Sequence, residues 1–431
     1  MRNTEAMERG RCQPLQQRWL AVVQEYADAP AVHLVAEGKM LTFAELHAAA
    51  ASLPPSQSLV RAQGQRLPFL LEVLRAWRDD AVLMPVEAAA DAVPRFPNLP
   101  AEVCHLKTTS GSSGAPRYVL FTADQLAADA DQIVRTMGLR QEWPNVAVIS
   151  LAHSYGFSNL VLPLLLHGIP MVIGDGPLPQ AMRKSLASGS DFTLAAVPAM
   201  WRAWHAAGLI SNRIRLAISA GAPLPLDLER GIFAASGVKI HNFYGSSECG
   251  GIAYDRTSLP REASWLTGTA MDGVTLAVDE VDGCLTVSSA AVGVGYIVAD
   301  PALSQGRFHT SDRVRITNGE VWLEGRTGEA INIAGRKVSP SVIEEILTAM
   351  PGVRHCVVFG IPSPDEAKVD EIAVCVNLSG CSTLEEVRQA GAHLLPDGRQ
   401  PRHWRVCPDL EPDERGKISR AAWRERWLRE A

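Results

Sequence analysis

Residues 108–117 have the sequence Thr-Thr-Ser-Gly-Ser-Ser-Gly-Ala-Pro-Arg, a run of small hydroxyl residues and glycines that ends on a cation. Glycines let a backbone approach a ligand closely, and the free N–H groups of such a loop form a concavity that binds anions. The hydroxyl groups add donors, and Arg117 adds a positive charge suited to phosphate. The run therefore predicts a cradle for a polyphosphate, although it lacks the Gly-Lys-Ser/Thr ending of a Walker loop.

The residues that follow this run argue against the alternative, a flexible linker rich in serine and glycine. Tyr118–Phe121 has the pattern of a strand. Thr122 and Gln125 then have the capping-box spacing that begins a helix. The loop is thus predicted to connect two regular elements.

Short apolar runs alternate with helical periods between residues 100 and 250. This alternation predicts a large layered α/β domain with mostly parallel sheets. Asp-Gly pairs at 272–273 and 282–283 then indicate turns in a small antiparallel region. The expected strands are Val146–Leu151, Thr193–Val197, Arg215–Ser219 and Val238–His241, and the expected helices are Ala123–Met137, Met200–Gly208 and Leu226–Ser236.

A small α+β domain is predicted over 326–431, after an N-terminal domain that covers 1–325. Ser339 before Pro340 is a typical helix start, and Ser382 with Glu385 has capping-box spacing. The expected strands are Ala330–Ala334, His355–Gly360, Glu371–Asn377 and His403–Cys407, and the expected helices are Val342–Met350 and Leu384–His393.

The composition excludes several classes of partner. A net charge of −6 over 431 residues gives no general attraction to nucleic acid or to an anionic membrane. Residues 1–17 lack the apolar segment of a signal peptide, and the apolar run Leu160–Ile173 is shorter than the ~20 residues that span a bilayer. The eight cysteines are scattered and are expected to be reduced thiols. We therefore expect a cytoplasmic protein that neither binds nucleic acid nor inserts into a membrane.

Four further segments carry residue types that suit a nucleotide site. Asn242–Glu248 follows a predicted strand, at the end where open α/β sheets bind ligands. Within it, the ring of Tyr244 can stack on a base and the carboxylate of Glu248 can hold Mg²⁺. Each segment taken alone also fits an ordinary turn. The other three segments are Phe308–Val314, whose Asp312 can accept the hydroxyls of a ribose, Gly325–Pro340, and Asp413–Arg420.

In this order the five segments resemble the adenylate-forming superfamily. That family contains acyl- and aryl-CoA synthetases, the adenylation domains of nonribosomal peptide synthetases, and firefly-type luciferases. Its phosphate loop, its Tyr-Gly-x-Thr-Glu and Thr-Gly-Asp motifs, its Gly-Arg hinge segment and its C-terminal Gly-Lys match residues 109–117, 244–248, 310–312, 325–340 and 416–417. The resemblance covers nearly the whole chain. It implies that a carboxylic acid attacks the α-phosphate of ATP and that a thiol then displaces AMP.

The resemblance also implies a role for each matching residue. Tyr244 would pack on adenine, Ser247 would touch the α-phosphate, and Glu248 would hold Mg²⁺. Lys417 would bridge the acid and the α-phosphate, so that Lys417, Glu248 and Ser247 form the catalytic set. Asp312 and Arg326 would hold the ribose. The implied nucleotide contacts are Thr109, Ser110, Gly111, Ser112, Ser113, Gly114, Arg117, Gly221, Ala222, Pro223, Tyr244, Gly245, Asp312 and Arg326.

Several residues depart from the family pattern, among them Asn332, which replaces a frequent lysine. Ser311 replaces a usual glycine, and Gly328 stands where the family commonly has Asp or Lys at its interdomain hinge. Because glycine tolerates the φ/ψ changes that rotation requires, Gly328 is expected to be the hinge of a mobile C-terminal domain. The region before the phosphate loop is also short for the family, which leaves less structure to wall a long acyl tunnel.

The segment Leu151–Asn159 resembles the family's His-containing pocket motif. Relatives that activate amino acids have an Asp where a gapless alignment puts Tyr155. An acid without an α-amine is therefore expected, either aryl or short to medium acyl. The implied acid contacts are His153, Tyr155, Val197, Ser219 and Gly245.

Three functions stay open on the sequence alone. The leading hypothesis is an AMP-forming acid–thiol ligase that uses ATP, Mg²⁺ and either CoA or a phosphopantetheine thiol. The second is a stand-alone adenylation enzyme that loads a dedicated acyl or aryl carrier protein. The third is a degenerate nucleotide-binding regulatory protein, and the joint retention of Glu248, Asp312, Arg326 and Lys417 argues against it.

Overall fold

The computed structural model describes residues 10–87, 96, 99–110, 116–188, 191–327, 329, 331–333, 336–363, 370–380, 382–395, 399–413 and 418–430. The chain divides into two compact units. The first comprises Met1–Ala277, Thr286–His309 and Asn318–Val321, and the second comprises Val278–Leu285, Thr310–Thr317 and Trp322–Ala431. Two earlier segments thus belong to the C-terminal unit, and the boundary at 325/326 stays a prediction.

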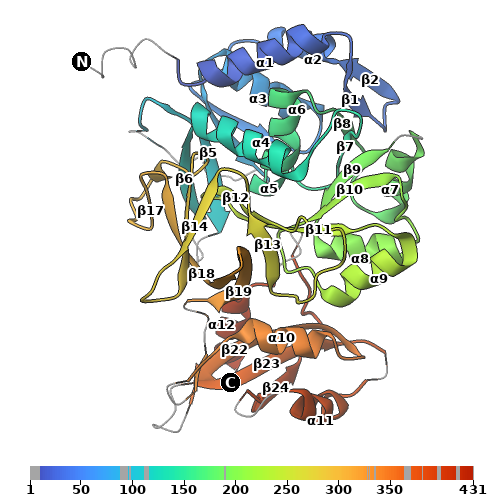
Figure 1. Ribbon diagram of the computed structural model, residues 1–431, viewed down its shortest axis with the longest axis vertical. Helices are drawn as coiled ribbons and strands as arrows, with labels where there is room; N and C mark the ends of the chain where they lie inside the picture. The colour runs from blue at the N-terminus through green and yellow to red at the C-terminus, as the bar shows by residue number, and fades with distance from the viewer. Residues whose placement is uncertain are drawn as a thin grey trace. The chain divides into compact units, whose positions relative to one another are not determined.

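A large sheet organises the first unit (Figure 1). Its parallel strands run in the spatial order β1, β8, β7, β9, β10 and β11. Antiparallel strands flank them, with β2 beside β1, and β12 and β13 beyond β11. The bounds are β1 (Pro30–Leu34), β2 (Lys39–Thr42), β7 (Asn145–Ala147), β8 (Met171–Ile173), β9 (Phe192–Ala196), β10 (Ile214–Ser219), β11 (Ile240–Ser246), β12 (Gly250–Tyr254) and β13 (Leu266–Ala270).

A second sheet of the first unit holds the predicted phosphate loop. Its order is β16 (Gly295–Tyr296), β6 (Pro116–Thr122), β5 (Val103–Ser110), β4 (Val82–Val86) and β3 (Leu59–Gln63). Strands β5 and β6 are antiparallel, and their register sets Thr109 opposite Arg117. The hairpin confirms that the Ser/Gly run connects regular elements, as predicted.

Helices cover these sheets (Figure 1), and five further strands lie between residues 274 and 326. The helices are α1 (Gln13–Tyr26), α2 (Phe43–Ala51), α3 (Leu67–Arg78), α4 (Ala123–Met137), α5 (Ser154–Gly156), the π-helical turn η1 (Phe157–Val161), α6 (Leu162–His167), α7 (Pro179–Ser185), the 3₁₀ turn η2 (Leu186–Ser188), α8 (Pro198–Ala206) and α9 (Leu226–Ser236). The strands are β14 (Val274–Val278), β15 (Cys284–Ser289), β17 (Leu303–Ser304), β18 (Arg307–Thr317) and β19 (Glu320–Arg326).

Helix α4 illustrates how local sequence sets the elements near the loop. The Thr122 hydroxyl accepts the N–H of Gln125, and the Gln125 side chain accepts the N–H of Thr122, so the predicted capping box is present. Gly138 ends the helix with a left-handed φ of +68°, which glycine adopts without strain. The apolar face of α4, including Leu126 and Ile133, is fully buried. Because α4 begins directly after β6, the helix cap also fixes the end of the strand that follows the Ser/Gly loop.

The second unit packs two apolar clusters on opposite faces of a sheet of β22, β23 and β24. Side chains alternate across a strand, and both faces here are apolar: Val358 and Val374 point to one cluster, Phe359 and Cys375 to the other. Trp427 of the last helix completes the second cluster. The elements are β20 (Ile331–Ile333), β21 (Arg336–Val338), α10 (Pro340–Thr348), β22 (Val353–Pro362), β23 (Asp370–Leu378), α11 (Leu384–Leu394), β24 (His403–Val406) and α12 (Arg420–Glu430).

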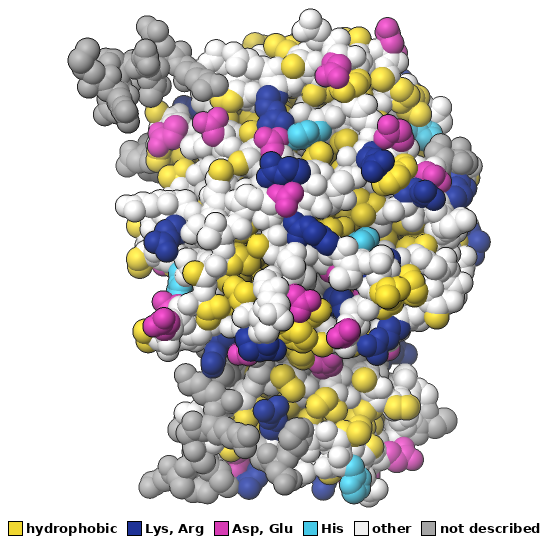
Figure 2. Space-filling model, in the orientation of Figure 1, with side chains coloured by type: hydrophobic (Ala, Val, Ile, Leu, Met, Phe, Trp, Pro, Cys, Tyr) yellow, Lys and Arg dark blue, Asp and Glu magenta, His cyan; other side chains and the backbone are white. Residues whose placement is uncertain are grey.

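The predicted fold class is confirmed: a large, mostly parallel α/β part with a small antiparallel region is followed by a small α+β part. One predicted capping box needs correction, and α8 begins at Pro198, two residues before the predicted Met200. The capping box of α11 is formed by Thr383 and Glu386, one residue beyond the predicted Ser382 and Glu385. Acidic and basic side chains are interspersed on the face that Figure 2 draws, in keeping with the modest net charge.

Candidate functional site

The β5–β6 hairpin carries the flanks of the predicted phosphate loop. Ser110 ends β5 and Pro116 begins β6, directly opposite one another in the register. Thr109 and Arg117 form the preceding pair of that register. The centre of the loop, Gly111, Ser112, Ser113 and Gly114, lies outside the described residues, so its predicted phosphate contacts stay predictions.

Arg117 of this hairpin is connected to the Glu248 carboxylate through the side chain of Tyr296. Its guanidinium carbon lies 3.5 Å from the centroid of the Tyr296 ring, and its Nη2 donates to Asp300 Oδ2 at 2.7 Å. The Tyr296 hydroxyl in turn donates to Glu248 Oε1 at 3.0 Å. Burial, followed by the nearby Glu248 charge, raises the pKa of Tyr296, so this phenol stays protonated as a donor. A cation of the phosphate-loop hairpin and the predicted metal-binding carboxylate thus meet on one tyrosine.

Glu248 lies in the turn from Ser246 to Gly250, which joins β11 to β12. The turn is held by hydrogen bonds on both sides. The Glu248 N–H donates to Ser246 Oγ at 3.2 Å, and the Gly293 N–H donates to the Glu248 carbonyl at 2.9 Å. A Cβ on Gly245 would lie 2.7 Å from the Gly250 carbonyl oxygen, so this close approach of two strands requires glycine.

Ser247 in the same turn is joined to the predicted acid-pocket segment. Ser154 Oγ donates to Ser247 Oγ at 2.7 Å. The next residue of that segment, Tyr155, directs its hydroxyl toward the main chain at the carboxyl ends of β9 and β10, 3.5 Å from the carbonyl oxygens of Ala196 and Ile218. The ring of Tyr155 lies 5.9 Å from that of Phe243. The structure therefore brings Ser247 next to the segment that carries Tyr155.

The other predicted pocket residues lie at the same end of the sheet. Ser219 ends β10, is fully buried, and its hydroxyl has no hydrogen-bond partner among the described residues. Gly221 follows with a left-handed φ of +84°, and a Cβ there would lie 3.3 Å from Val197 Cγ1. His153 Nδ1 accepts the N–H of Tyr155 at 3.3 Å, which makes His153 the cap of α5. Ala222 and Pro223 continue the loop that follows Gly221.

Burial also raises the pKa of Tyr155, since its phenol lies in apolar surroundings. Tyr155 is therefore a neutral hydrogen-bonding group at neutral pH and offers no charge to a substrate amine. Among the residues that face Tyr155 here, Ala196, Ile218 and Phe243 are likewise uncharged. The described contacts of Tyr155 named here therefore carry no charge.

The predicted ribose-binding pair belongs to the second unit. Arg326 Nε donates to Asp312 Oδ1 at 2.6 Å, and the Asp312 N–H donates to Thr310 Oγ1 at 3.0 Å. Asp312 is only 8% exposed. The Thr327 N–H, donating to the Ser311 carbonyl at 2.8 Å, holds the strands around this pair. Asp312 and Arg326 are thus brought together as predicted, whereas their contact with a nucleotide stays a prediction.

The hinge residue Gly328 and the catalytic candidate Lys417 lie outside the described residues. Neighbours of both are described and belong to one network. Arg420 pairs with Glu329 and with Glu344, where its Nη2 lies 2.8 Å from Glu344 Oε2. Arg420 Nε also donates to the Val358 carbonyl at 2.8 Å. The segments next to Gly328 and next to Lys417 are therefore anchored at one guanidinium.

Several side chains at this site have no signal in the sequence motifs. Tyr296 and Asp300 lie within the antiparallel region and are brought to Arg117 by the pairing of β16 with β6. Lys107, in β5, is a lysine at a buried strand position, which is an unusual placement that could have drawn attention. No pattern in the sequence pairs it with Asp129, 22 residues further along.

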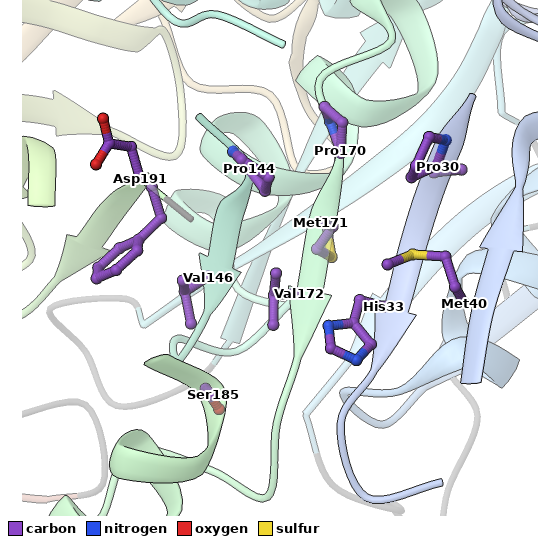
Figure 3. Close-up of a pocket in the computed structure, with 12 residues that line it drawn as sticks. Pro30, His33, Met40, Pro144, Val146, Pro170, Met171, Val172, Ser185 and Asp191 are labelled. Atoms are coloured by element: carbon purple, nitrogen blue, oxygen red, sulfur yellow. The ribbon is translucent and has the colours of Figure 1, made fainter. Parts of the chain in front are cut away.

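A shallow hollow elsewhere in the first unit contains none of the predicted site residues. It lies over β1, β7 and β8, and its lining is mostly apolar, with His33, Ser185 and Asp191 as polar members (Figure 3). No helix in the described part of the chain is long and apolar enough to cross a membrane.

Comparisons with known proteins agree on the family. The model of the AMP-binding enzyme family matches residues 57–299. A probable 2-succinylbenzoate–CoA ligase of Mycobacterium tuberculosis is 29% identical over 384 residues, covering 85% of this chain and 96% of that protein. ATP-bound MatB from Rhodopseudomonas palustris superposes with a TM-score of 0.80 at 18% identity, covering 96% of this chain and 99% of that one. An o-succinylbenzoate CoA synthetase from Bacillus subtilis, in complex with its acyl-adenylate, gives 0.79 at 18% identity, covering 94% and 97%.

Proposed function

This chain belongs to the AMP-binding enzyme family, and we propose that it joins an aryl or short to medium acyl acid to the thiol of coenzyme A through an acyl-adenylate. The reaction type, AMP-forming ligation of an acid to a thiol with consumption of ATP, is that of an acyl- or aryl-CoA synthetase. The observation that carries the proposal is the junction at Tyr296, where Arg117 of the phosphate-loop hairpin and Glu248 of the β11–β12 turn meet.

The reaction needs such a junction because both reactants are anions. Cations and N–H donors must offset the repulsion between carboxylate and triphosphate and stabilise the charge that develops at phosphorus. In the proposal, Thr109, Ser110 and the loop that follows hold the β- and γ-phosphates beside Arg117. Ser247 contacts the α-phosphate. Lys417 bridges the acid and the α-phosphate as they react.

The adenosine contacts are assigned to the residues that match the family motifs. Tyr244 packs on one face of adenine, and the loop Gly221-Ala222-Pro223 with Gly245 lines the other. Asp312 and Arg326 hold the ribose hydroxyls, for which their existing ion pair supplies an oriented carboxylate. A rotation about Gly328 would let the C-terminal unit serve adenylation and thiol transfer in turn.

The donor set around Glu248 fits a magnesium ion. Mg²⁺ takes oxygen ligands and is typically held by one or two carboxylates together with substrate phosphates. Glu248 is half-buried, one of its oxygens accepts the Tyr296 hydroxyl, and Ser247 adjoins it. When bound there, the ion would neutralise charge on the triphosphate. The chain's own contribution is to hold the Glu248 carboxylate in one orientation.

The acid class follows from the Tyr155 pocket. The hydroxyl of Tyr155 faces two main-chain carbonyls, and its surroundings are uncharged. An α-ammonium placed there would lose its water without gaining a carboxylate partner, which disfavours amino acids. His153, Val197, Ser219 and Gly245 complete the proposed contacts with the acid.

Acid-dependent ATP–pyrophosphate exchange tests the proposal. The purified protein is offered benzoate-type, short-chain and long-chain acids, and nucleotide products are separated with and without coenzyme A. We expect AMP and pyrophosphate, with a preference for aryl or short acids over long-chain ones, and an acyl-CoA product. Formation of ADP and phosphate would refute the reaction type. Acid adenylation without transfer to free coenzyme A, together with transfer to a carrier protein, would identify a carrier-loading enzyme instead.

A further inference from the structure

A buried ionic cluster lies behind the turn that carries Ser247 and Glu248. We name Lys107, Asp129 and Ser158 the ionic triad. Lys107 Nζ lies 3.4 Å from Asp129 Oδ2 and 3.3 Å from Ser158 Oγ, and Ser158 Oγ donates to Asp129 Oδ2 at 2.5 Å. The three residues are 4%, 1% and 4% exposed. Full burial of both a lysine and an aspartate is rare in proteins.

Each member of the triad comes from a different element of the candidate site. Lys107 is in β5, three residues before Ser110 at the start of the phosphate loop. Ser158 is in η1, four residues after Ser154, whose hydroxyl donates to Ser247. Asp129 is in α4, the helix that follows the same hairpin. The triad therefore cross-links three segments that the proposed reaction uses.

Asp129 also touches the turn itself. A Cβ on Gly250 would lie 2.2 Å from Asp129 Oδ1, so the carboxylate packs directly on the Gly250 backbone. Asp129 Oδ1 has no hydrogen-bond partner among the described residues. On the other side of the turn, Ser246 Oγ lies 3.2 Å from Cys249 Sγ. The turn is thus held by its own hydrogen bonds and by packing of Gly250 against the buried Asp129 carboxylate.

Stability alone does not require this arrangement. Removing two charges from water is costly, and well-packed apolar residues in place of a buried ion pair are often neutral or stabilising. An ion pair instead adds positional specificity, because an ammonium and a carboxylate that bond to one another fix the relative position of the elements that carry them. We propose that Lys107, Asp129 and Ser158 are positioning residues that hold the Ser246–Gly250 turn in register with the end of β5, so that Ser247 and Glu248 meet the nucleotide. This inference rests on the proposed function.

The test separates positioning from stability. The double variant K107M/D129L replaces both charges with apolar groups, and Ser158→Ala removes only the bridging hydroxyl. Asp131→Asn is the matched control, because Asp131 is in the same helix but pairs with Arg18 Nη2 at 2.7 Å, outside the triad. For each variant we would measure the melting temperature, amide hydrogen exchange of a peptide spanning 244–250, and both half-reactions.

For K107M/D129L we expect a melting temperature at or above that of the wild type, but amide exchange over 244–250 that is about tenfold faster. Pyrophosphate exchange should fall about tenfold or more with a raised half-saturating Mg²⁺ concentration, while transfer from preformed acyl-adenylate stays close to wild type. Ser158→Ala should shift the same quantities less, and should do so even if the double variant fails to fold. Asp131→Asn should leave the peptide and both half-reactions unchanged.

A folded double variant with wild-type amide exchange over 244–250 would overturn the inference, as would equal losses in both half-reactions. For a double variant that does not fold, wild-type values in Ser158→Ala would overturn it. The amide-exchange measurement needs no turnover. A wild-type protein without acid-dependent exchange would therefore refute the proposed function, while the peptide data would still decide whether the triad holds the turn.

Discussion

At the scale of single residues, the proposed chemistry depends on how Glu248 is oriented. One hydrogen bond from Tyr296 fixes that carboxylate, and the same ring carries the Arg117 guanidinium. Asp300 also accepts a hydrogen bond from Arg117. The pKa of Asp300 lies below its usual value because its carboxylate accepts hydrogen bonds from the Ala302 N–H and the Arg117 guanidinium. Arg117 is therefore already oriented before a triphosphate binds.

Tyr296→Phe tests this orientation. The variant keeps the ring under Arg117 and removes only the donor to Glu248. A hydrogen bond to a charged group contributes about 1.5 kcal/mol or more, so pyrophosphate exchange should fall about tenfold at saturating acid. Glu248→Gln should fall further, by about 100-fold, because it removes the charge itself. Tyr118→Phe is the control on the same strand as Arg117; its ring packs on Phe96 instead. Unchanged exchange in Tyr296→Phe would show that Glu248 is oriented by other contacts.

At the scale of elements, several contacts of Arg420 anchor the start of α12. Arg420 bonds to Glu344 of α10, to the Val358 carbonyl of β22, and to Glu329 beside the expected hinge. Burial raises the pKa of Glu344, and Arg420 opposes that rise. The charge of Glu344 is therefore tolerated chiefly because Arg420 is present.

Arg420→Ala should destabilise the second unit in a pH-dependent way. Without the guanidinium, the pKa of Glu344 in the folded state rises further above its value in the unfolded chain. Stability is then retained below the unfolded value, where Glu344 is protonated in both states, and is lost as pH rises through the folded value. We expect a loss of about 3 kcal/mol at pH 8 and a much smaller loss near pH 4. Urea unfolding at both pH values measures it.

Two further variants make this prediction specific. Arg424→Ala lies one turn further along α12, where the Arg424 side chain bonds only to the Gly360 carbonyl among the contacts described, and it should show little pH dependence. R420M/E344Q should recover most of the stability at pH 8. A loss in Arg420→Ala that is equal at the two pH values would contradict the account based on Glu344.

Sequence patterns predicted helices and strands well where the pattern depends on residues close together in the chain. The capping box at Thr122 and the periodic apolar face gave α4 with its observed bounds, and α9 likewise begins and ends as predicted. The strand expected at Val146–Leu151 is only Asn145–Ala147, because the residues after it turn toward α5 instead of continuing to pair. The ordered motifs named Glu248, Asp312 and Arg326, but not Tyr296 or the ionic triad. Those side chains meet through long-range strand and helix contacts that no local pattern encodes.

At the scale of the whole molecule, the proposed cycle uses the C-terminal unit twice. In this proposal Lys417 would be needed only while the acid attacks the α-phosphate, since its ammonium would then lie between two anions. Lys417→Ala should slow adenylate formation by a few orders of magnitude, which corresponds to ~3–5 kcal/mol. Transfer from presynthesised acyl-adenylate to the thiol should continue close to the wild-type rate. Normal adenylate formation by this variant would make Gly416-Lys417 an ordinary surface turn.

Gly328→Pro tests the hinge directly. Proline fixes φ near −65° and removes an N–H, so one backbone arrangement at this position should be favoured over others. We expect one half-reaction to be impaired much more than the other, measured as pyrophosphate exchange and as transfer from preformed adenylate. Gly319→Pro, at a turn between β18 and β19 with φ +81°, controls for backbone strain alone. Equal loss of both half-reactions in a folded Gly328→Pro would remove the support for a hinge.

The burial of the described cysteines should protect the protein from acylation by its own acyl-adenylate intermediate. An acyl-adenylate acylates any thiolate within reach, and Cys249 directly follows Glu248 in the chain. The described cysteines are all free and buried, and burial raises the pKa of Cys249 and of Cys356 to about 12. These sulfurs stay protonated and are poor nucleophiles at neutral pH. Incubation with acid and ATP but no acceptor should therefore leave these buried cysteines unmodified, as peptide mass spectrometry would measure.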